Sequence, residues 1–179
     1  MSHSNEKKEQ ILEQVSQKVA QGEGRELGAS FVQRFFRRVP AAEMDELSPD
    51  DLAALATGYL DFARQRVGHE IRFRVYNPRQ DRHGWESSHT IIEIVNDDMP
   101  FLVDSITAKL AELEAQVHLI IHPILEVERD AKRRIHDVRE TGRSADSVSE
   151  KAQAARGAVA SGTKTDGGET IGRESLMHI

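Results

Sequence analysis

The chain has 179 residues, and 24 Lys and Arg against 30 Asp and Glu give it a formal net charge of −6. This acidic balance argues against polyanion binding as the main task, and the lack of cysteine excludes disulfides, thiolate nucleophiles and thiolate metal ligands. The start of the chain is polar, unlike a secretory or transit peptide, and no apolar run approaches the ~20 residues that cross a membrane. We therefore expect a cytoplasmic protein that binds neither membrane nor nucleic acid.

The first third of the chain has the pattern of three amphipathic helices. The first two, residues 6–20 and 25–39, place apolar residues on one stripe: Ile11, Val15, Val19, Leu27, Phe31 and Phe35. The third has the clearest start, because Ser48 precedes Pro49 and Asp51 follows Ser48 by three residues, which approximates a capping box. These stretches predict an N-terminal helical hairpin or small bundle.

From residue 71 onward, the spacing between apolar residues changes from that of a helix to the two-residue period of a strand. There the sequence alternates apolar Ile71, Phe73 and Val75 with Arg72, Arg74 and Tyr76, which predicts a half-buried strand. A mostly apolar strand is expected at residues 90–95, and a helix from about 100 to 115. Residues 117–129 read as a long strand, in which Pro123 implies an edge position or a bulge.

Residues 130–172 mix charged residues with Ser, Ala and Gly and contain few large aliphatic side chains. That is too little apolar surface to offset an ordering cost of roughly 1–2 kcal/mol per residue for the backbone. We expect a flexible insertion, with a marginal helix at residues 147–159 and a linker at 161–168. Residues 173–179 look like the start of a further strand, truncated by the end of the chain.

A polar turn between the expected strand and helix contains the candidate site residues Asn96, Asp97, Asp98, Met99 and Pro100. The two aspartates could be an acid/base pair or ligands of a hard cation, but no spaced acidic loop surrounds them to supply the six or more oxygens of a calcium site. We prefer the structural alternative, in which one aspartate caps the helix. Free backbone N–H groups of the turn remain a candidate site for a small anion or amino acid.

Two histidines and a group of arginines are further candidates. His118 and His122 have the spacing of a metal pair, but on a strand they would lie ~13 Å apart, too far to share one zinc. They could instead sense pH or line a partner surface. A second set interleaves basic and aromatic residues, as single-strand binding requires: Arg34, Phe35, Phe36, Arg37 and Arg38. The core spacing of the phenylalanines and the nearby acids favour a solvated helix face. We expect no catalytic, cofactor-binding or metal-binding residue.

Five blocks carry a resemblance to a known family: RVYNP at 74–78, GWES at 84–87, EIVNDDMPFLVDS at 93–105, HLIIHPIL at 118–125 and ESLMHI at 174–179. In wording, order and separation they resemble the N-terminal region of the large NAD-dependent glutamate dehydrogenases of bacteria. The resemblance covers about the last 105 residues, with 130–172 unmatched.

The resemblance implies an α+β protein with an N-terminal helical hairpin or bundle and a partial ACT-like sheet, that is, part of a ferredoxin-like βαββαβ unit with an antiparallel sheet and a helix. We divide the chain into a helical region (1–69), the first part of the ACT-like unit (70–129), the insertion (130–172) and the start of a further strand (173–179). The second helix and last strand of the unit would be missing, so this fragment would expose sheet edges that favour self-association.

The resemblance also implies a non-catalytic regulatory or assembly region of an enzyme that oxidatively deaminates L-glutamate to 2-oxoglutarate with NAD. The chain lacks the catalytic and NAD-binding domains, so it would hold no cofactor itself. Its partners would be the rest of the dehydrogenase chain, other subunits of a homo-oligomer, and an amino-acid effector at Asn96–Pro100, where Phe101 replaces the glycine of many ACT domains. The alternatives are a stand-alone small-molecule-binding ACT-like module, a small enzyme that uses Asp97 and Asp98, and a nucleic-acid-binding module.

Overall fold

The computed structural model describes residues 3–20, 25–141, 163–164 and 170–179. In chain order the elements are α1 (His3–Val19), α2 (Arg25–Phe35), α3 (Ala41–Met44), α4 (Pro49–Arg64), β1 (Arg72–Tyr76), α5 (Gln80–His83), β2 (Ile91–Asp97), α6 (Leu102–Glu112), β3 (Ile124–Arg129), β4 (Ile135–Glu140), β5 (Thr163–Lys164) and β6 (Thr170–His178). None of the described helices is long and apolar enough to span a membrane.

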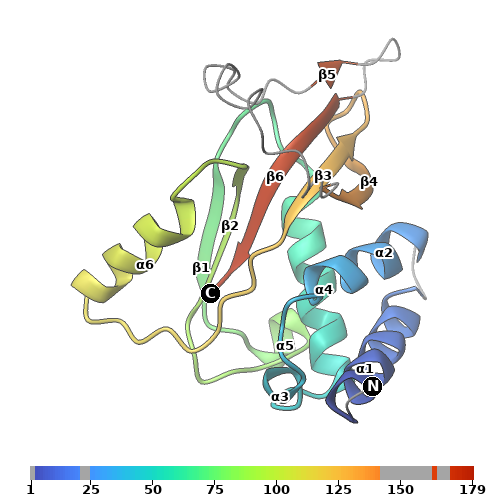
Figure 1. The fold of residues 1–179 in the computed structure, drawn as a ribbon, viewed down its shortest axis with the longest axis vertical. Coiled ribbons are helices and arrows are strands. Elements are labelled where there is room, and N and C mark those ends of the chain that lie inside the picture. Colours follow the sequence, from blue (N-terminus) through green and yellow to red (C-terminus); the bar gives the residue numbers. More distant parts are fainter. Residues whose placement is uncertain (1–2, 21–24, 142–162, 165–169) are drawn as a thin grey trace, which may run out of the picture.

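The strands form one antiparallel sheet in the order β1-β2-β6-β3-β4, with the short β5 paired to β6 (Figure 1). Helix α6 connects β2 to β3, and β6 lies between these two strands although it follows both in the sequence. The α+β class, with N-terminal helices followed by an antiparallel sheet and a helix, is therefore confirmed.

Helices α2 and α4 pack against one face of the sheet, and α1 packs against these two helices, so that the three enclose the core (Figure 1). The rings of Phe31, Phe35 and Tyr59 are fully buried, and the centroid of the Phe35 ring lies 4.9 Å from that of Phe31 and 4.8 Å from that of Tyr59. The Tyr59 hydroxyl donates to the backbone carbonyl of Ile94 at 2.7 Å, which ties α4 to β2. The sheet completes this core with Ile91, Val95, Leu125, Val127 and Leu176.

The start of α4 confirms the predicted capping box. The Ser48 hydroxyl accepts a hydrogen bond from the backbone N–H of Asp51 at 3.1 Å, and the Asp51 carboxylate accepts one from the backbone N–H of Ser48 at 3.2 Å. Pro49 follows at the first helical position. Two backbone donors that α4 cannot satisfy internally are thus satisfied by side chains.

Strand β1 is confirmed, but its apolar residues lie on the exposed face. An alternating pattern usually buries the apolar residues, yet Ile71, Phe73 and Val75 are 60%, 71% and 58% exposed. The partly buried Arg74 lies opposite the buried Glu93 of β2, on the face that packs against the helices. An ion pair between these two residues therefore turns the apolar side chains of β1 outward.

The strand predicted at residues 117–129 is shorter than expected and starts after its proline. Strand β3 begins at Ile124, and within residues 117–123 only Ile121 pairs, through an isolated bridge to His178. Pro123 has no N–H to donate, but its carbonyl accepts a hydrogen bond from Leu176. The predicted edge position is wrong, because β3 lies between β6 and β4.

Part of the predicted insertion is regular structure. Strand β4 pairs with β3 and buries Ile135 and Val138. Two aliphatic residues are therefore enough to order this strand, because β3 supplies a hydrogen-bonding partner. The Asp130 carboxylate organises the connecting turn by accepting hydrogen bonds from the backbone N–H groups of Lys132 and Arg134 at 2.8 and 2.9 Å.

Strand β6 confirms the strand expected near the end of the chain and starts three residues earlier than predicted, at Thr170. The helix predicted at 147–159 lies outside the described residues, as does the linker at 161–168 apart from β5, and the division into domains stays a prediction.

Candidate functional site

The predicted site residues lie where β2 ends next to β6, and both aspartates are in ion pairs. The Asp97 carboxylate lies 2.8 Å from Nη1 of Arg66 and 2.6 Å from Nδ1 of His69. The Asp98 carboxylate lies 2.8 Å from Nη2 of Arg173 on β6. The aspartates therefore have different partners and do not face each other as an acid/base pair would.

The predicted capping of the next helix by an aspartate is wrong. Helix α6 begins at Leu102, and its N-cap residue is Phe101, which makes no side-chain capping hydrogen bond. Phe101 has a φ of 63°, a backbone conformation that favours glycine, and its side chain is 76% exposed. A bulky residue held in this strained conformation marks a constrained junction between β2 and α6.

The backbone of the turn is partly occupied by contacts with β6. The N–H of Asp98 donates to the carbonyl of Arg173 at 3.0 Å, which extends the pairing of β2 and β6 by one residue. The buried Asn96 side chain donates to the sulfur of Met99 at 3.4 Å, and Met99 itself is half exposed. Effector binding at Asn96–Pro100 stays a prediction.

A buried ionic cluster of Arg66, Asp97, Arg129 and Glu174 joins α4 to the sheet. Arg129 on β3 donates from Nε and Nη2 to both oxygens of Glu174 at 2.7 and 2.8 Å, a bidentate pair. The same guanidinium donates to the carbonyls of Ala63 and Arg64 at 3.1 Å each, and so satisfies acceptors at the end of α4. Arg66, which is 2% exposed, adds contacts to both carboxylates of the cluster.

A second buried carboxylate, that of Glu93, is surrounded by donors. Arg74 donates to Glu93 at 2.5 Å and the Tyr76 hydroxyl at 3.0 Å, and Nδ1 of His178 lies 3.1 Å away. Burial alone would raise the pKa of Glu93, but the hydrogen bonds and charges of His178 and Arg74 outweigh it, so the pKa lies below its ordinary value. Burial, followed by the charge of Glu93, raises the pKa of Tyr76 far above the physiological range. The Glu93 carboxylate therefore stays ionised at neutral pH and is engaged by Arg74, Tyr76 and His178, which suits a structural role.

The candidate histidines also have separate partners. The His118 ring centroid lies 4.4 Å from that of His89, whereas Nε2 of His122 lies 2.7 Å from the hydroxyl of Ser175 on β6. Burial lowers the pKa of His122, which the charge of Asp98 opposes and that of Arg38 reinforces. Within the described residues no group of three or more His, Asp or Glu side chains could hold a metal ion.

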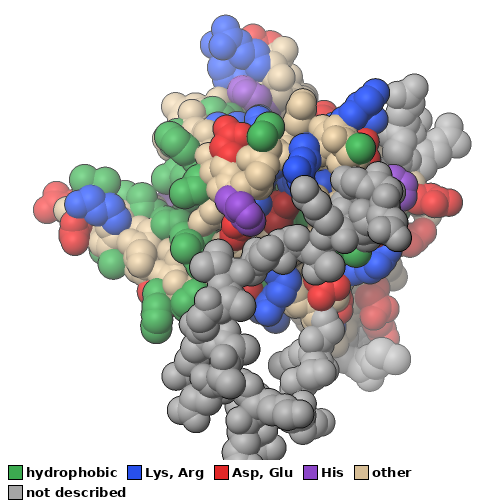
Figure 2. All heavy atoms as spheres, turned by 90° about the horizontal axis from the view of Figure 1, so that it is seen from above, with side chains coloured by type: hydrophobic (Ala, Val, Ile, Leu, Met, Phe, Trp, Pro, Cys, Tyr) green, Lys and Arg blue, Asp and Glu red, His purple; other side chains and the backbone are tan. Residues whose placement is uncertain are grey.

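Apolar side chains are exposed around α6 and on the side of the sheet that the N-terminal helices do not cover. Their exposed fractions range from 40% for Val117 to 76% for Phe101, and we call the set the open apolar surface: Ile71, Phe73, Val75, Met99, Phe101, Leu113 and Val117. Helix α6 buries none of its residues and projects away from α1, α2 and α4 (Figure 1). Figure 2 shows hydrophobic side chains gathered along this projecting helix and on the adjoining side of the molecule.

The sequence did not reveal the charged residues that the fold buries: Arg66, Arg129, Glu174 and His178. One local signal existed, since Glu93 interrupts the apolar run of β2 and a charged residue inside such a run needs a partner. By contrast, the prediction that Phe35 and Phe36 belong to the core is confirmed, since both are 1% exposed.

Comparison with known proteins identifies the family. The model of the family described as "Glutamate dehydrogenase, ACT1 domain" matches residues 31–179. This chain belongs to that family. It is 35% identical over 109 residues to the NAD-specific glutamate dehydrogenase of Halomonas elongata, a match that covers 61% of this chain and 7% of the relative.

The enzyme of the same name from Pseudomonas aeruginosa is 29% identical to this chain over 121 residues, which cover 68% of this chain and 8% of that protein. No solved structure matches. The resemblance to NAD-dependent glutamate dehydrogenases is confirmed, and this glutamate dehydrogenase ACT1 domain corresponds to only a small part of the relatives' length.

Proposed function

We propose that this ACT1 domain is a non-catalytic assembly region near the N-terminus of a cytoplasmic NAD-dependent glutamate dehydrogenase, and that its open apolar surface is an interface within that enzyme. The rest of the dehydrogenase would oxidatively deaminate L-glutamate to 2-oxoglutarate and would bind the NAD. The expected partners are the remainder of the dehydrogenase chain and other subunits of a homo-oligomer, with neither nucleic acid nor membrane among them.

The exposure of the apolar side chains of β1 is the observation that carries this proposal. Phe73 and Val75 lie on one face of this edge strand, Ile71 directly precedes it, and each of the three is more than half exposed. Contiguous apolar surface of this kind usually marks a protein–protein interface. Among the described residues β1 pairs with β2 alone, and such a sheet edge offers a second means of association.

Helix α6 supports the same role. Its apolar positions recur at helical spacing and include Leu102, Val103, Ile106 and Leu110, none of which is buried. A helix of 11 residues is marginal on its own in water, and most helices gain stability by packing an apolar face against another element. We infer that α6 acquires such a packing partner in the assembled enzyme.

The contacts of the charged residues agree with a non-catalytic role. Glu93, Glu174 and Asp97 are engaged by arginines or histidines, and two of these three carboxylates are buried. Regulation by an amino-acid effector at Asn96–Pro100 remains the finer part of the hypothesis, and calorimetric titration of the domain with amino acids would test it.

Mass photometry of the full-length dehydrogenase would test the assembly role. Replacing both Phe73 and Val75 by Ser should shift the enzyme toward smaller species, whereas the exposed control Glu46→Ser should leave its mass distribution unchanged. An unchanged distribution in the double variant would show the assembly role to be wrong. Micromolar binding of NAD by the isolated chain in calorimetry would contradict its non-catalytic role.

A further inference from the structure

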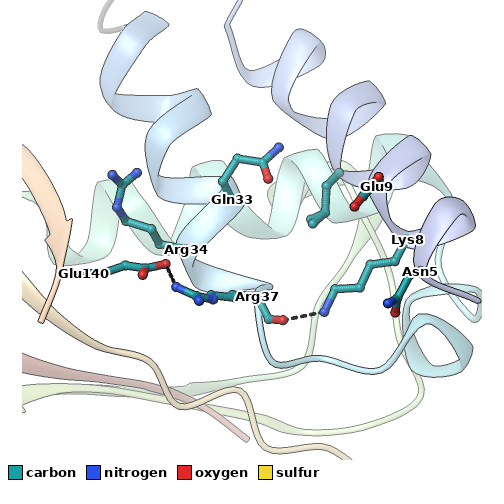
Figure 3. Close-up of a pocket in the computed structure, with 8 residues that line it drawn as sticks. Asn5, Lys8, Glu9, Gln33, Arg34, Arg37 and Glu140 are labelled. Carbon is teal, nitrogen blue, oxygen red and sulfur yellow. Dashed lines mark hydrogen bonds and ion pairs between the residues drawn. The ribbon is translucent and has the colours of Figure 1, made fainter. Parts of the chain in front are cut away.

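A pocket of about 430 Å³ opens between α1, α2 and the end of β4. Lys8 and Glu9 reach it from α1, Arg34 from α2, Arg37 from the turn after α2, and Glu140 from β4 (Figure 3). The buried side chain of Leu12 contributes an apolar wall. Helix α1 precedes residues 31–179, which the family model matches. The pocket therefore lies between α1 and elements that belong to the matched part of the chain.

Lys8 in this pocket is held against the backbone of Arg37. Nζ of Lys8 donates to the backbone carbonyl of Arg37 at 2.5 Å. Partial burial, followed by the positive charge of Arg37, lowers the pKa of Lys8. The two positive charges therefore repel each other, and an anion bound near both would offset that repulsion.

The pocket also has donors that the fold does not use. Arg34 donates from Nη1 to the carbonyl of Ser30 at 2.9 Å, but its Nε is buried and has no hydrogen-bond partner within the described part of the chain. A lysine ammonium has three N–H donors, and one carbonyl occupies only one of those of Lys8. A buried donor without an acceptor is costly, so an oxyanion that reaches it would be favoured.

Glu140, an acid that lines this pocket, forms an ion pair with one of its cations. Its carboxylate pairs with Arg37, and the two side chains are 47% and 60% exposed. Exposed ion pairs contribute little to stability, so an incoming anion could displace Glu140 from Arg37 at small cost. The acid then acts as an internal competitor for the site.

We propose that this pocket binds a small oxyanion, a carboxylate or phosphate group, through Lys8, Arg34 and Arg37, in competition with Glu140. The ligand contacts the ammonium of Lys8 and the guanidinium groups of Arg34 and Arg37, and the wall around Leu12 accommodates an apolar portion. The site is independent of the open apolar surface and of the proposed assembly role.

Calorimetric titration of the 179-residue chain at constant ionic strength would test the site, with inorganic phosphate in one arm and glutarate in the other. We expect saturable binding in at least one arm, and the stronger arm identifies the ligand class. Arg37→Gln should weaken that binding about tenfold or more, because it removes a charge-assisted donor. Its neighbour Arg38→Gln is the matched control, since it removes the same charge outside the pocket and should change affinity less than about twofold.

Glu140→Gln provides the decisive variant, because it should tighten binding by releasing Arg37, an effect that a loss of stability cannot imitate. Equal weakening by Arg37→Gln and Arg38→Gln would show that only diffuse surface charge attracts the anion, and would overturn the proposal. Absence of saturation in both arms up to about 10 mM would overturn it as well, as would a Glu140→Gln variant that binds no more tightly than the original chain.

Discussion

On the sheet face that the N-terminal helices cover, even charged side chains are buried, whereas the opposite face leaves large apolar side chains in solvent. Glu93 is fully buried on the covered face, and Phe73 is 71% exposed on the open one. Both residues belong to the β1–β2 pair, one residue apart in register. The difference teaches that hydrophobic pattern alone does not decide which face of a strand is buried, because a paired charge can occupy the inner side.

The largest contrast between the faces is expected for the buried ion pair of Arg129 and Glu174. Arg129→Ala should lower the free energy of unfolding by about 3–5 kcal/mol, because it leaves a buried carboxylate and two carbonyls of α4 without their donor. Arg139→Ala removes the ion pairs that an exposed guanidinium on the edge strand β4 makes with Glu128 and Asp137, and it should leave the stability nearly unchanged. Urea denaturation of both variants measures the difference. Equal, small losses would mean that the cluster does not hold α4 to the sheet.

Two phenylalanines give the same comparison for apolar side chains. Phe35→Ala should destabilise the chain by about 3–5 kcal/mol, since it opens a cavity between α2, α4 and the sheet. Phe73→Ala removes the same atoms from the open face and should change the free energy of unfolding by no more than about 0.5 kcal/mol. A large loss for Phe73→Ala in the chain alone would show that the open face is covered in solution.

The buried carboxylate of Glu93 should make the covered face sensitive to acid. Its pKa in the folded chain lies below the ordinary value of 4.5, so its ionised form stabilises the fold above that pH, and the contribution is lost as the pH falls further. Denaturation midpoints between neutral pH and about pH 3 should therefore decrease in the original chain. Glu93→Gln should be less stable at neutral pH and should lose stability less steeply in acid. An unchanged slope would exclude Glu93 as a source of the acid sensitivity.

A smaller effect is expected at the start of α4, the helix that ties the covered face together. Ser48→Ala removes one acceptor of the capping box and should cost about 0.5–2 kcal/mol, measurable as a lower thermal midpoint. Thr57→Ser on the exposed side of the same helix is the control. A loss confined to the control would contradict the capping role.

Local patterns were enough to predict the longer helices α1, α2, α4 and α6, strand β2 and the capping box, because periodicity and turn chemistry act over a few residues. The order of the sheet was harder to obtain, since β6 pairs with strands more than 40 and 70 residues earlier in the chain. Long separation along the sequence also kept the ionic cluster from being predicted, since in it Arg66 contacts Asp97 and Glu174. The wrong capping prediction has a similar cause, because Asp97 and Asp98 are engaged by arginines that only the tertiary fold brings near.

The central position of β6 bears on how the chain can fold during synthesis. The pair β1–β2 and the hairpin β3–β4 have only β6 between them, so neither half of the sheet can join the other until residues 170–178 have left the ribosome. Until then the nascent chain presents two unjoined strand pairs, and such edges invite wrong partners. We expect folding of the sheet to occur late and to be limited by this long-range closure, which gives chaperones a defined interval in which to act.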